Sequence, residues 1–410
     1  MNTRLSPDQC VACTTCVVHC PVAEATPDFL GPRMIGPAYE RFRLMGLAED
    51  PSLHYCANCK NCDISCPQNV PVSSINMRAR AEQCRRRPPS FRDWLLAHGE
   101  LEAALLRHVP AGLKNWGMNN ACTRRVLDWL GIHKNAPLPP FAARSFRQEV
   151  RRLVQTRQEK QVVFFPGCYV DVYDPACGLD MLWLLQRAGY EVIVPEAFVC
   201  CGLPLIANGF LDDAREKARR NMAELVRWRR AGIPVLTGCP SCALMFRQDL
   251  PEFFPELCSE LCPDTGPDSP PLLQDAQEFL LDRLEEGQLR LNEGPSDTPP
   301  QAVAYHAPCH LRATGNGLPG LELLRRLPHV QVTHVDAGCC GISGSYGFKK
   351  EKYHIAMEVG SRLFAAVRES RAALAVSECG TCRVQLGHGT GLPTLHPVSL
   401  LRCHLEGAAT

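Results

Sequence analysis

The chain has 410 residues, of which 45% are apolar and 21% are charged, so it can form ordinary globular cores, and its length suggests two to four domains. The net charge is +1, which gives no overall attraction to nucleic acid, and no nucleic-acid partner is expected. We find neither an apolar secretory segment nor the ~20 apolar residues of a spanning helix. The 24 cysteines are unusual, and in a reducing compartment this density favours metal binding over disulfides.

Two cysteine runs with the spacing C-x2-C-x2-C-x3-C-P lie within residues 1–85, the first predicted domain. This spacing is typical of bacterial ferredoxins, in which three thiolates of a run hold one [4Fe–4S] cluster and the fourth reaches the other cluster. Zinc is the alternative, but it is commonly bound by two separated C-x2-C pairs. We therefore expect one cluster on Cys10, Cys13, Cys16 and Cys66, and a second on Cys56, Cys59, Cys62 and Cys20.

Residues 86–157 are expected to form a basic, amphipathic helical connector. Residues 78–157 contain 16 Lys or Arg and 6 Asp or Glu, a net charge of +10. A helix over 90–108, capped by Ser90, would place on one face Phe91, Trp94, Leu95, Leu101 and Leu105. A second helix, ending at Gly131, would have on one side Val126, Trp129 and Leu130. Such helices can lie in a membrane interface, and the alternative is a connector packed on its own domains.

From residue 158 onward, strand patterns alternate with helix patterns, and the whole order occurs twice. Each half has one cysteine after its first strand, an adjacent Cys-Cys-Gly after the second, and C-x2-C after the third. The offsets between equivalent cysteines are 141, 139, 139, 140 and 140 residues. This duplication predicts two α/β domains with parallel strands, at 158–262 and 301–410, joined by a Pro-rich seam with one helix at 263–300. The fold class is therefore a multidomain α+β and α/β protein.

Each predicted α/β domain gathers five cysteines at the carboxyl ends of its strands, where open parallel sheets form their binding sites. The first set is Cys168, Cys200, Cys201, Cys239 and Cys242, and the second is Cys309, Cys339, Cys340, Cys379 and Cys382. Five thiolates exceed the needs of a simple [4Fe–4S] cube or of tetrahedral zinc, which indicates an unusual cluster, although zinc on four of the five remains open. The glycine after each pair would let the backbone approach the metal.

Six further cysteines match no ligand spacing, and buried free thiols are the expectation for them. They are Cys84, Cys122, Cys177, Cys258, Cys262 and Cys403.

These motifs together resemble the iron–sulfur subunits related to heterodisulfide reductase, over nearly the whole chain. The segments "GPRMIGPAYERFRL", "YCANCKNCDISCP", "CCGLPLIANGF" and "CCGISGSYGFKKE" are most similar to the branch that serves anaerobic glycerol-3-phosphate dehydrogenases. The resemblance implies a subunit without catalytic residues of its own, which takes electrons from an FAD-dependent partner and passes them to menaquinone. It also implies peripheral attachment at the cytoplasmic face of the cell membrane, and noncubane [4Fe–4S] clusters at one or both five-cysteine sites, with zinc at the first site as the alternative.

Three other functions stay open from the sequence. The chain could serve a glycolate or lactate oxidase complex instead, differing only in its partner. It could be a disulfide reductase in which a five-cysteine cluster attacks the substrate. It could also be a zinc scaffold without redox activity, which its iron content would exclude.

Overall fold

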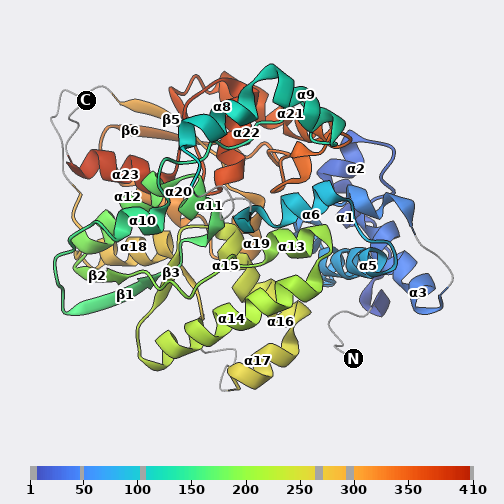
Figure 1. Cartoon of the computed structure of the whole chain (residues 1–410), viewed down its shortest axis with the longest axis horizontal. Helices are drawn as coiled ribbons and strands as arrows, with labels where there is room; N and C mark the ends of the chain where they lie inside the picture. Colours follow the sequence, from blue (N-terminus) through green and yellow to red (C-terminus); the bar gives the residue numbers. More distant parts are fainter. Residues whose placement is uncertain (1–6, 47–49, 102–107, 264–270, 292–299, 407–410) are drawn as a thin grey trace.

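Figure 1 presents the chain as a computed structural model, which describes residues 7–46, 50–101, 108–263, 271–291 and 300–406. Short helices surround the two cysteine runs at one side of the molecule (blue in Figure 1). Among these described residues, no helix is both long and apolar enough to cross a bilayer. The helices of this N-terminal part are α1 (Thr15–Val18), α2 (Pro21–Ala25), α3 (Tyr39–Leu44), α4 (Asn61–Ile64) and α5 (Val72–Arg86).

The two cysteine runs fold in the same way. In each run, the residues on either side of the second cysteine have left-handed backbone conformations, and a one-turn helix (α1 or α4) follows. The φ angles are 57° at Ala12, 63° at Thr14, 54° at Asn58 and 64° at Lys60. Left-handed conformations cost non-glycine residues roughly 1–2 kcal/mol each. The common backbone therefore indicates that both loops are shaped to present their thiols and are held by other contacts.

The connector is helical, but the helix expected over 90–108 is not continuous. Ser90 caps α6 (Phe91–Ala97) as predicted, because its side chain accepts a hydrogen bond from the Asp93 amide. The prediction was wrong in continuity, since α6 ends at Ala97, the backbone of His98 is not helical, and helical residues resume at 99–101. The ring of His98 bonds instead to the Trp94 carbonyl at 2.8 Å and to the Asp213 carboxylate at 3.2 Å. Leu105, expected on this face, lies outside the described residues.

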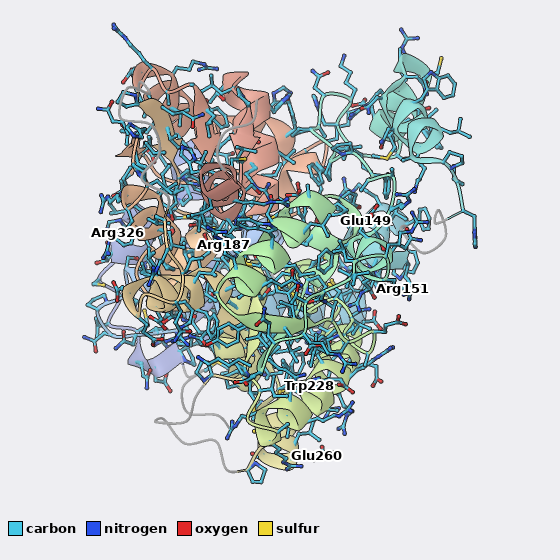
Figure 2. All side chains as sticks on the ribbon, turned by 90° about the vertical axis from the view of Figure 1, so that its left-hand side faces the viewer. Glu149, Arg151, Arg187, Trp228, Glu260 and Arg326 are labelled. Carbon is cyan, nitrogen blue, oxygen red and sulfur yellow. The ribbon has the colours of Figure 1, made fainter. Side chains whose placement is uncertain are left out.

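Two further connector helices, α8 (Ala111–Asn119) and α9 (Ala121–Trp129), pack on each other and stand apart from the main body in Figure 2 (teal). Gly131 ends the second helix with a φ of 92°, as its sequence predicts. Their large apolar side chains are exposed, with 67% of the Trp116 surface and 83% of the Trp129 surface accessible. Trp94 is less exposed, at 38%. The apolar face predicted for this segment is therefore not covered by the described part of the chain.

The duplicated half-chains form two parallel sheets of equal design. The first has the order β2-β1-β3-β4 and the second β6-β5-β7-β8, all neighbours parallel. The strands of the first sheet are β1 (Lys160–Phe164), β2 (Tyr190–Ile193), β3 (Val235–Thr237) and β4 (Gln274–Asp275). Those of the second are β5 (Gln301–Tyr305), β6 (Val330–His334), β7 (Leu374–Val376) and β8 (Thr394–Leu395). The predicted duplication and parallel strands are thus confirmed.

Helices connect these strands and cover the sheets, as in other open α/β folds. The helices of the first unit are α10 (Phe146–Val150), α11 (Gly167–Val172), α12 (Pro175–Arg187), α13 (Leu203–Asn208), α14 (Leu211–Arg230), α15 (Pro240–Leu244), α16 (Leu250–Phe253), α17 (Pro255–Leu261) and α18 (Ala276–Glu285). Those of the second unit are α19 (Cys309–Thr314), α20 (Pro319–Arg325), α21 (Tyr353–Glu369), α22 (Gly380–Thr390) and α23 (Pro397–Glu406). The strand β4 and the helix α18 come from the segment that the sequence assigned to the seam at 263–300, and the boundaries proposed for the domains stay a prediction.

The two halves share one apolar core through exchanged helices. The helix that follows the first sheet, α18, packs on α20 of the second half, and α23, which follows the second sheet, packs on α12 of the first half. A single cluster of buried side chains accordingly joins both halves and includes Val162, Leu185, Val303 and Leu323. Gly238 accepts a hydrogen bond from the His396 ring at 3.2 Å across the same contact. The pair of sheets is therefore one unit of packing.

A buried carboxyl group at this contact predicts a pH dependence of stability. Burial raises the pKa of Glu378 from 4.5 to about 8, and its side chain accepts a hydrogen bond from the Tyr305 hydroxyl at 2.6 Å. Because the unfolded chain releases this proton at lower pH than the fold does, stability falls as pH rises from 4.5 to about 8. One titrating group changes the free energy of unfolding by about 1.4 kcal/mol per pH unit in this range.

The substitution Glu378→Gln keeps the acceptor for Tyr305 and removes the titration. We expect the free energy of unfolding of the variant to depend less on pH between 6.5 and 8, by roughly 1 kcal/mol per unit, in denaturant titrations. Asp275, whose pKa burial raises to about 6, titrates mostly below this window. Equal slopes for the two proteins would show that Glu378 is ionised in the fold.

Candidate metal centres

The first ferredoxin-type site combines three thiols of the first run with one of the second. Cys10, Cys13, Cys16 and Cys66 line one small cavity. Burial raises the pKa of Cys16 to about 11, and the neighbouring charges of Cys10, Cys66 and Cys13 act in the same direction. A cation at this point would relieve the repulsion between the thiolates, as metal–thiolate bonding does. The structure thus places together the four residues expected for the first cluster.

The second ferredoxin-type site combines three thiols of the second run with the fourth thiol of the first run. Burial raises the pKa of Cys20 to about 11, and the charge of Cys56 adds to the effect. Burial also raises the pKa of Cys62, followed by the charges of Asp63, Cys59, Cys56 and Cys20. Cys20 therefore joins the thiols of the other run, as the crossed ligand pattern predicts. The two one-turn helices, α1 and α4, contact each other, and each fourth cysteine lies two residues beyond the end of its helix.

The first five-cysteine site forms where β1, β2 and β3 end. The sulfur atoms of Cys168 and Cys200 lie 3.7 Å apart. Hydrogen bonds from Cys200 and Cys242 lower the pKa of Cys201 to about 6, and one from Cys242 lowers the pKa of Cys239. All five predicted thiols are thus brought together at one edge of the sheet.

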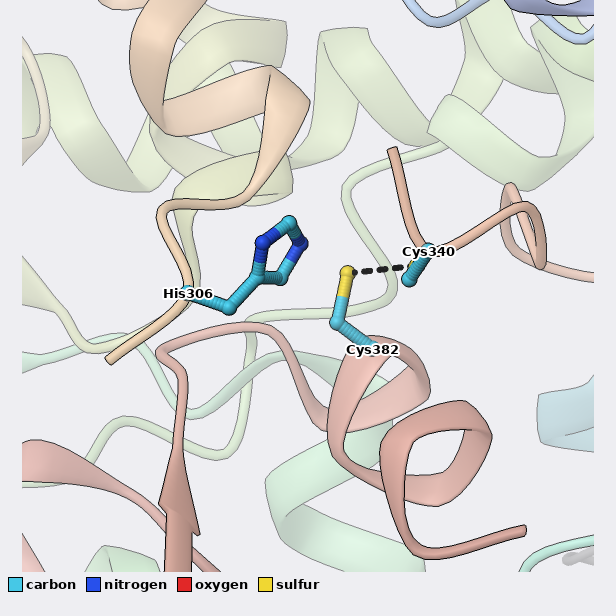
Figure 3. A group of neighbouring side chains, drawn as sticks. All are labelled: His306, Cys340 and Cys382. Carbon is cyan, nitrogen blue, oxygen red and sulfur yellow. Dashed lines mark hydrogen bonds between the residues drawn. The ribbon is translucent and has the colours of Figure 1, made fainter. Parts of the chain in front are cut away.

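The second five-cysteine site repeats this arrangement beyond β5, β6 and β7. The sulfur atoms of Cys340 and Cys382 lie 3.1 Å apart (Figure 3). A hydrogen bond from Cys382 lowers the pKa of Cys379 to about 5. A hydrogen bond to Cys339 and burial both raise the pKa of Cys309. These five thiols also form one group.

The glycine after each adjacent pair takes a backbone conformation that favours glycine, and its expected role in bringing the backbone near a metal stays a prediction. Gly202 and Gly341 have left-handed φ angles of 94° and 86°. A Cβ atom on Gly341 would lie 1.9 Å from the Ala356 carbonyl oxygen, and one on Gly202 would lie 3.4 Å from that of Ala214. These partners are on α21 and α14, so the glycine permits the turn that holds each cysteine pair against a helix.

A histidine joins the second five-cysteine site, which the sequence did not indicate. The ligand atoms of His306, Cys340 and Cys382 all lie within 4.8 Å of one another. Figure 3 shows the ring beside the two thiols. Burial lowers the pKa of His306 to about 4, so the imidazole is neutral at pH 7. A comparison of the two half-sequences could have revealed it, because Phe165 stands at the equivalent position of the first half.

The four sites adjoin one another in an order that differs from chain order. Cys16 and Cys20 interact electrostatically and link the two ferredoxin-type sites. Burial and then the charge of Cys339 raise the pKa of Cys59, so the second ferredoxin-type site adjoins the second five-cysteine site. The charge of Cys379 acts on Cys239, which brings the two five-cysteine sites together. The second five-cysteine site therefore adjoins both the second ferredoxin-type site and the first five-cysteine site.

His310 lies where three of these sites meet. Its ring bonds to the Ser241 hydroxyl at 2.8 Å, within the C-x2-C loop of the first five-cysteine site. The other ring nitrogen bonds to the Asn58 carbonyl at 3.1 Å, within the second ferredoxin-type loop. His310 itself follows Cys309 of the second five-cysteine site. Hydrogen bonds thus fix the relative positions of all three loops.

The donor sets fit iron–sulfur chemistry. They consist of thiols that are mostly buried, and soft thiolate ligands of this kind select zinc, copper(I) or iron–sulfur clusters. None of the cysteines in the described residues forms a disulfide.

The six cysteines without ligand spacing differ in their exposure. Cys177 and Cys262 are buried, and Cys84 and Cys258 are partly buried. Cys122 and Cys403 are exposed, so the expectation of buried thiols was wrong for Cys122 and Cys403.

Comparison with known proteins supports these assignments. A family model described as 4Fe–4S dicluster domain matches residues 6–70, and a cysteine-rich domain model, CCG, matches residues 162–247 and 303–387. The C subunit of the anaerobic glycerol-3-phosphate dehydrogenase of Escherichia coli K12 is 36% identical over 402 residues, covering 96% of this chain and 97% of the relative.

Two more distant relatives also match over long stretches of the chain. The B subunit of the fumarate reductase (CoM/CoB) of Methanothermobacter marburgensis is 26% identical over 390 residues, which cover 92% of this chain and 67% of the relative. Lactate utilization protein A of Bacillus licheniformis is 28% identical over 239 residues, covering 56% of this chain and 92% of the relative.

The fold and the sites define an iron–sulfur protein in which a 4Fe–4S dicluster domain precedes two cysteine-rich CCG domains, and the predicted fold class is confirmed. With its identity and coverage, the chain belongs to the family formed by the C subunits of anaerobic glycerol-3-phosphate dehydrogenases.

Proposed function

We propose that this chain is the electron-transfer subunit of a glycerol-3-phosphate dehydrogenase complex, receiving electrons from an FAD-dependent subunit and delivering them to menaquinone. The observation that carries the proposal is the unbroken series of four thiol sites, in which each site adjoins the next. The name of the E. coli relative supplies the substrate of the complex.

The cluster ligands that we propose are the residues of the four sites. Cys10, Cys13, Cys16 and Cys66 hold one [4Fe–4S] cluster, and Cys20, Cys56, Cys59 and Cys62 hold the other. The five-cysteine sites, Cys168 to Cys242 and Cys309 to Cys382, hold noncubane [4Fe–4S] clusters, with zinc as the alternative at the first. Iron–sulfur clusters exchange single electrons, and the chain positions them and shields them from water.

The quinone is proposed to bind in a cavity of about 450 Å³ beside the second ferredoxin-type site. Its wall includes Cys56, and the other walls come from the end of α5, the end of α13 and the loop around Tyr346. The Tyr346 hydroxyl is buried and has no hydrogen-bond partner within the described residues. It is suited to donate a hydrogen bond to a quinone carbonyl, and the volume lies in the range of small-molecule sites.

Replacement of Tyr346 by phenylalanine is expected to raise the KM for a soluble menaquinone analogue roughly tenfold, the cost of one buried hydrogen bond. The measurement uses the complete complex and follows glycerol-3-phosphate-dependent quinone reduction. EPR spectra of the reduced variant should retain all cluster signals. An unchanged KM would show that the quinone binds at another place on the complex.

Membrane docking is proposed through the exposed apolar side chains of α8 and α9, at the cytoplasmic face of the cell membrane. Burying a large apolar side chain contributes about 1.5–3 kcal/mol, and a basic residue near anionic lipid about 1 kcal/mol. We expect the double variant Trp116→Ser/Trp129→Ser to bind vesicles with anionic lipid at least tenfold more weakly in co-sedimentation. Equal binding of both proteins would indicate that this face contacts another protein of the complex.

The decisive experiment for the function combines metal analysis with EPR during turnover. We expect about 16 irons per chain for four clusters, or about 12 with zinc at one site, on the basis of four irons per cluster. Mixing with reduced flavoprotein and glycerol 3-phosphate should reduce the clusters, and quinone should reoxidise them. Reduction by a glycolate or lactate flavoprotein alone would favour the alternative complex. Reduction of a mixed disulfide at the quinone rate would favour a disulfide reductase.

A further inference from the structure

The two cysteine-rich halves differ at one position that faces their cysteines. By the offset that relates Cys168 to Cys309, His306 corresponds to Phe165. The backbone confirms the match, because the Phe165 amide donates to Leu236 at 2.7 Å and the His306 amide donates to Val376 at 2.9 Å. Both residues follow the central strand of their sheet, β1 or β5.

The surroundings of these two residues differ in chemistry. Phe165 is fully buried and packs against the rings of Phe198 and Phe246, with centroids 5.0 and 5.7 Å away. It belongs to the same apolar cluster as Cys201 and Cys242, the equivalents of Cys340 and Cys382. The first site therefore has a hydrocarbon wall where the second has an imidazole.

The imidazole of His306 is not explained by packing. Its Nε2 atom is buried and has no hydrogen-bond partner within the described residues. A buried polar atom without a partner costs about 1–3 kcal/mol, and the first half shows that the fold accepts a phenyl ring at this position. One ring nitrogen of His306 and the sulfur atoms of Cys340 and Cys382 lie within 4.8 Å of one another, a separation that the ligands of one metal ion have. A metal in the site would satisfy Nε2.

We propose that His306 is a sixth donor of the second cysteine-rich site and binds its metal centre directly, so that this centre has mixed thiolate and imidazole ligands while the first has thiolates only. The inference rests on the proposed function only in requiring a metal centre at the site.

The test is pulsed EPR on the iron-loaded chain grown with 14N- or 15N-labelled histidine, recorded after dithionite reduction and after mild oxidation. We expect one nitrogen coupling of the size of a directly bound imidazole, which changes with the isotope. The variant His306→Phe copies the first half and should lose this coupling. Phe165→His is the matched control for the other half, and it should leave the original coupling in place.

The outcomes separate the inference from the function. Protein that contains iron but shows no histidine coupling in either state overturns the inference, as does a coupling that persists in His306→Phe. Because the labelled wild-type chain is sufficient for the first result, a variant that fails to fold does not prevent the test. Protein that contains no iron overturns the proposed function instead. Electron transfer to quinone is measured separately and does not depend on which atom binds the metal.

Discussion

Protein produced without iron is expected to lose the fold of its N-terminal domain while the two parallel sheets keep much of theirs. One apolar cluster around the ferredoxin-type loops is small, with Cys16 and Cys62 among five buried members, while Cys20 and Cys56 lie in a larger cluster shared with the first cysteine-rich unit. Structural metal sites contribute roughly 10–16 kcal/mol to folding in small domains, which this core cannot replace. The sheets, in contrast, share a large apolar core that contains few cysteines.

Hydrogen exchange followed by mass spectrometry measures this difference along the chain. Backbone amides in residues 7–46 and 50–70 should exchange far faster in the iron-free protein, while β1 and β5 should remain protected. Reconstitution with iron and sulfide under reducing conditions should restore protection, which distinguishes metal loss from irreversible damage. An iron-free protein with a protected N-terminal domain would show that the cysteines are not needed to hold it together.

The substitution Lys60→Met is expected to destabilise the holoprotein by about 3–5 kcal/mol, because it leaves buried carboxylates without their cation. Lys60 is only 1% exposed, and its ammonium lies 2.7 Å from the Asp249 carboxylate. Although burial opposes it, the charges of Asp249, Asp63 and Glu252 raise the pKa of Lys60. Since Asp249 lies on the first cysteine-rich unit, this ion pair attaches the second ferredoxin-type loop to that unit.

Denaturant unfolding under anaerobic conditions measures the effect, with iron content as a second readout. The double variant Lys60→Met/Asp249→Leu removes both charges and should recover most of the lost stability. Arg85→Met is the matched surface control, because its pair with Asp212 is exposed and should contribute less than about 1 kcal/mol. A loss of this small size for Lys60→Met would mean that water reaches Asp249 in the native state.

The sequence was informative where structure follows from local spacing. The ferredoxin-type runs predicted which cysteines lie together, and the repeat offsets predicted two equal sheets, because short periodic patterns determine loops and strands directly. His98 interrupts α6 because its ring bonds to Asp213, more than a hundred residues away. The order of the four sites likewise depends on contacts such as that of Cys59 with Cys339. His306 was missed because one histidine carries no spacing of its own.

The exchange of α18 and α23 between the halves has a consequence for how such a chain can be divided. If the gene were cut within residues 264–270, the first product would lack β4, a strand of its own sheet, and the helix α18. The second product would contain β4 and α18 without the rest of the first sheet. Each fragment would expose the face that its missing neighbour covers. The duplicated halves can therefore diverge in their metal ligands, yet they must fold together as one unit.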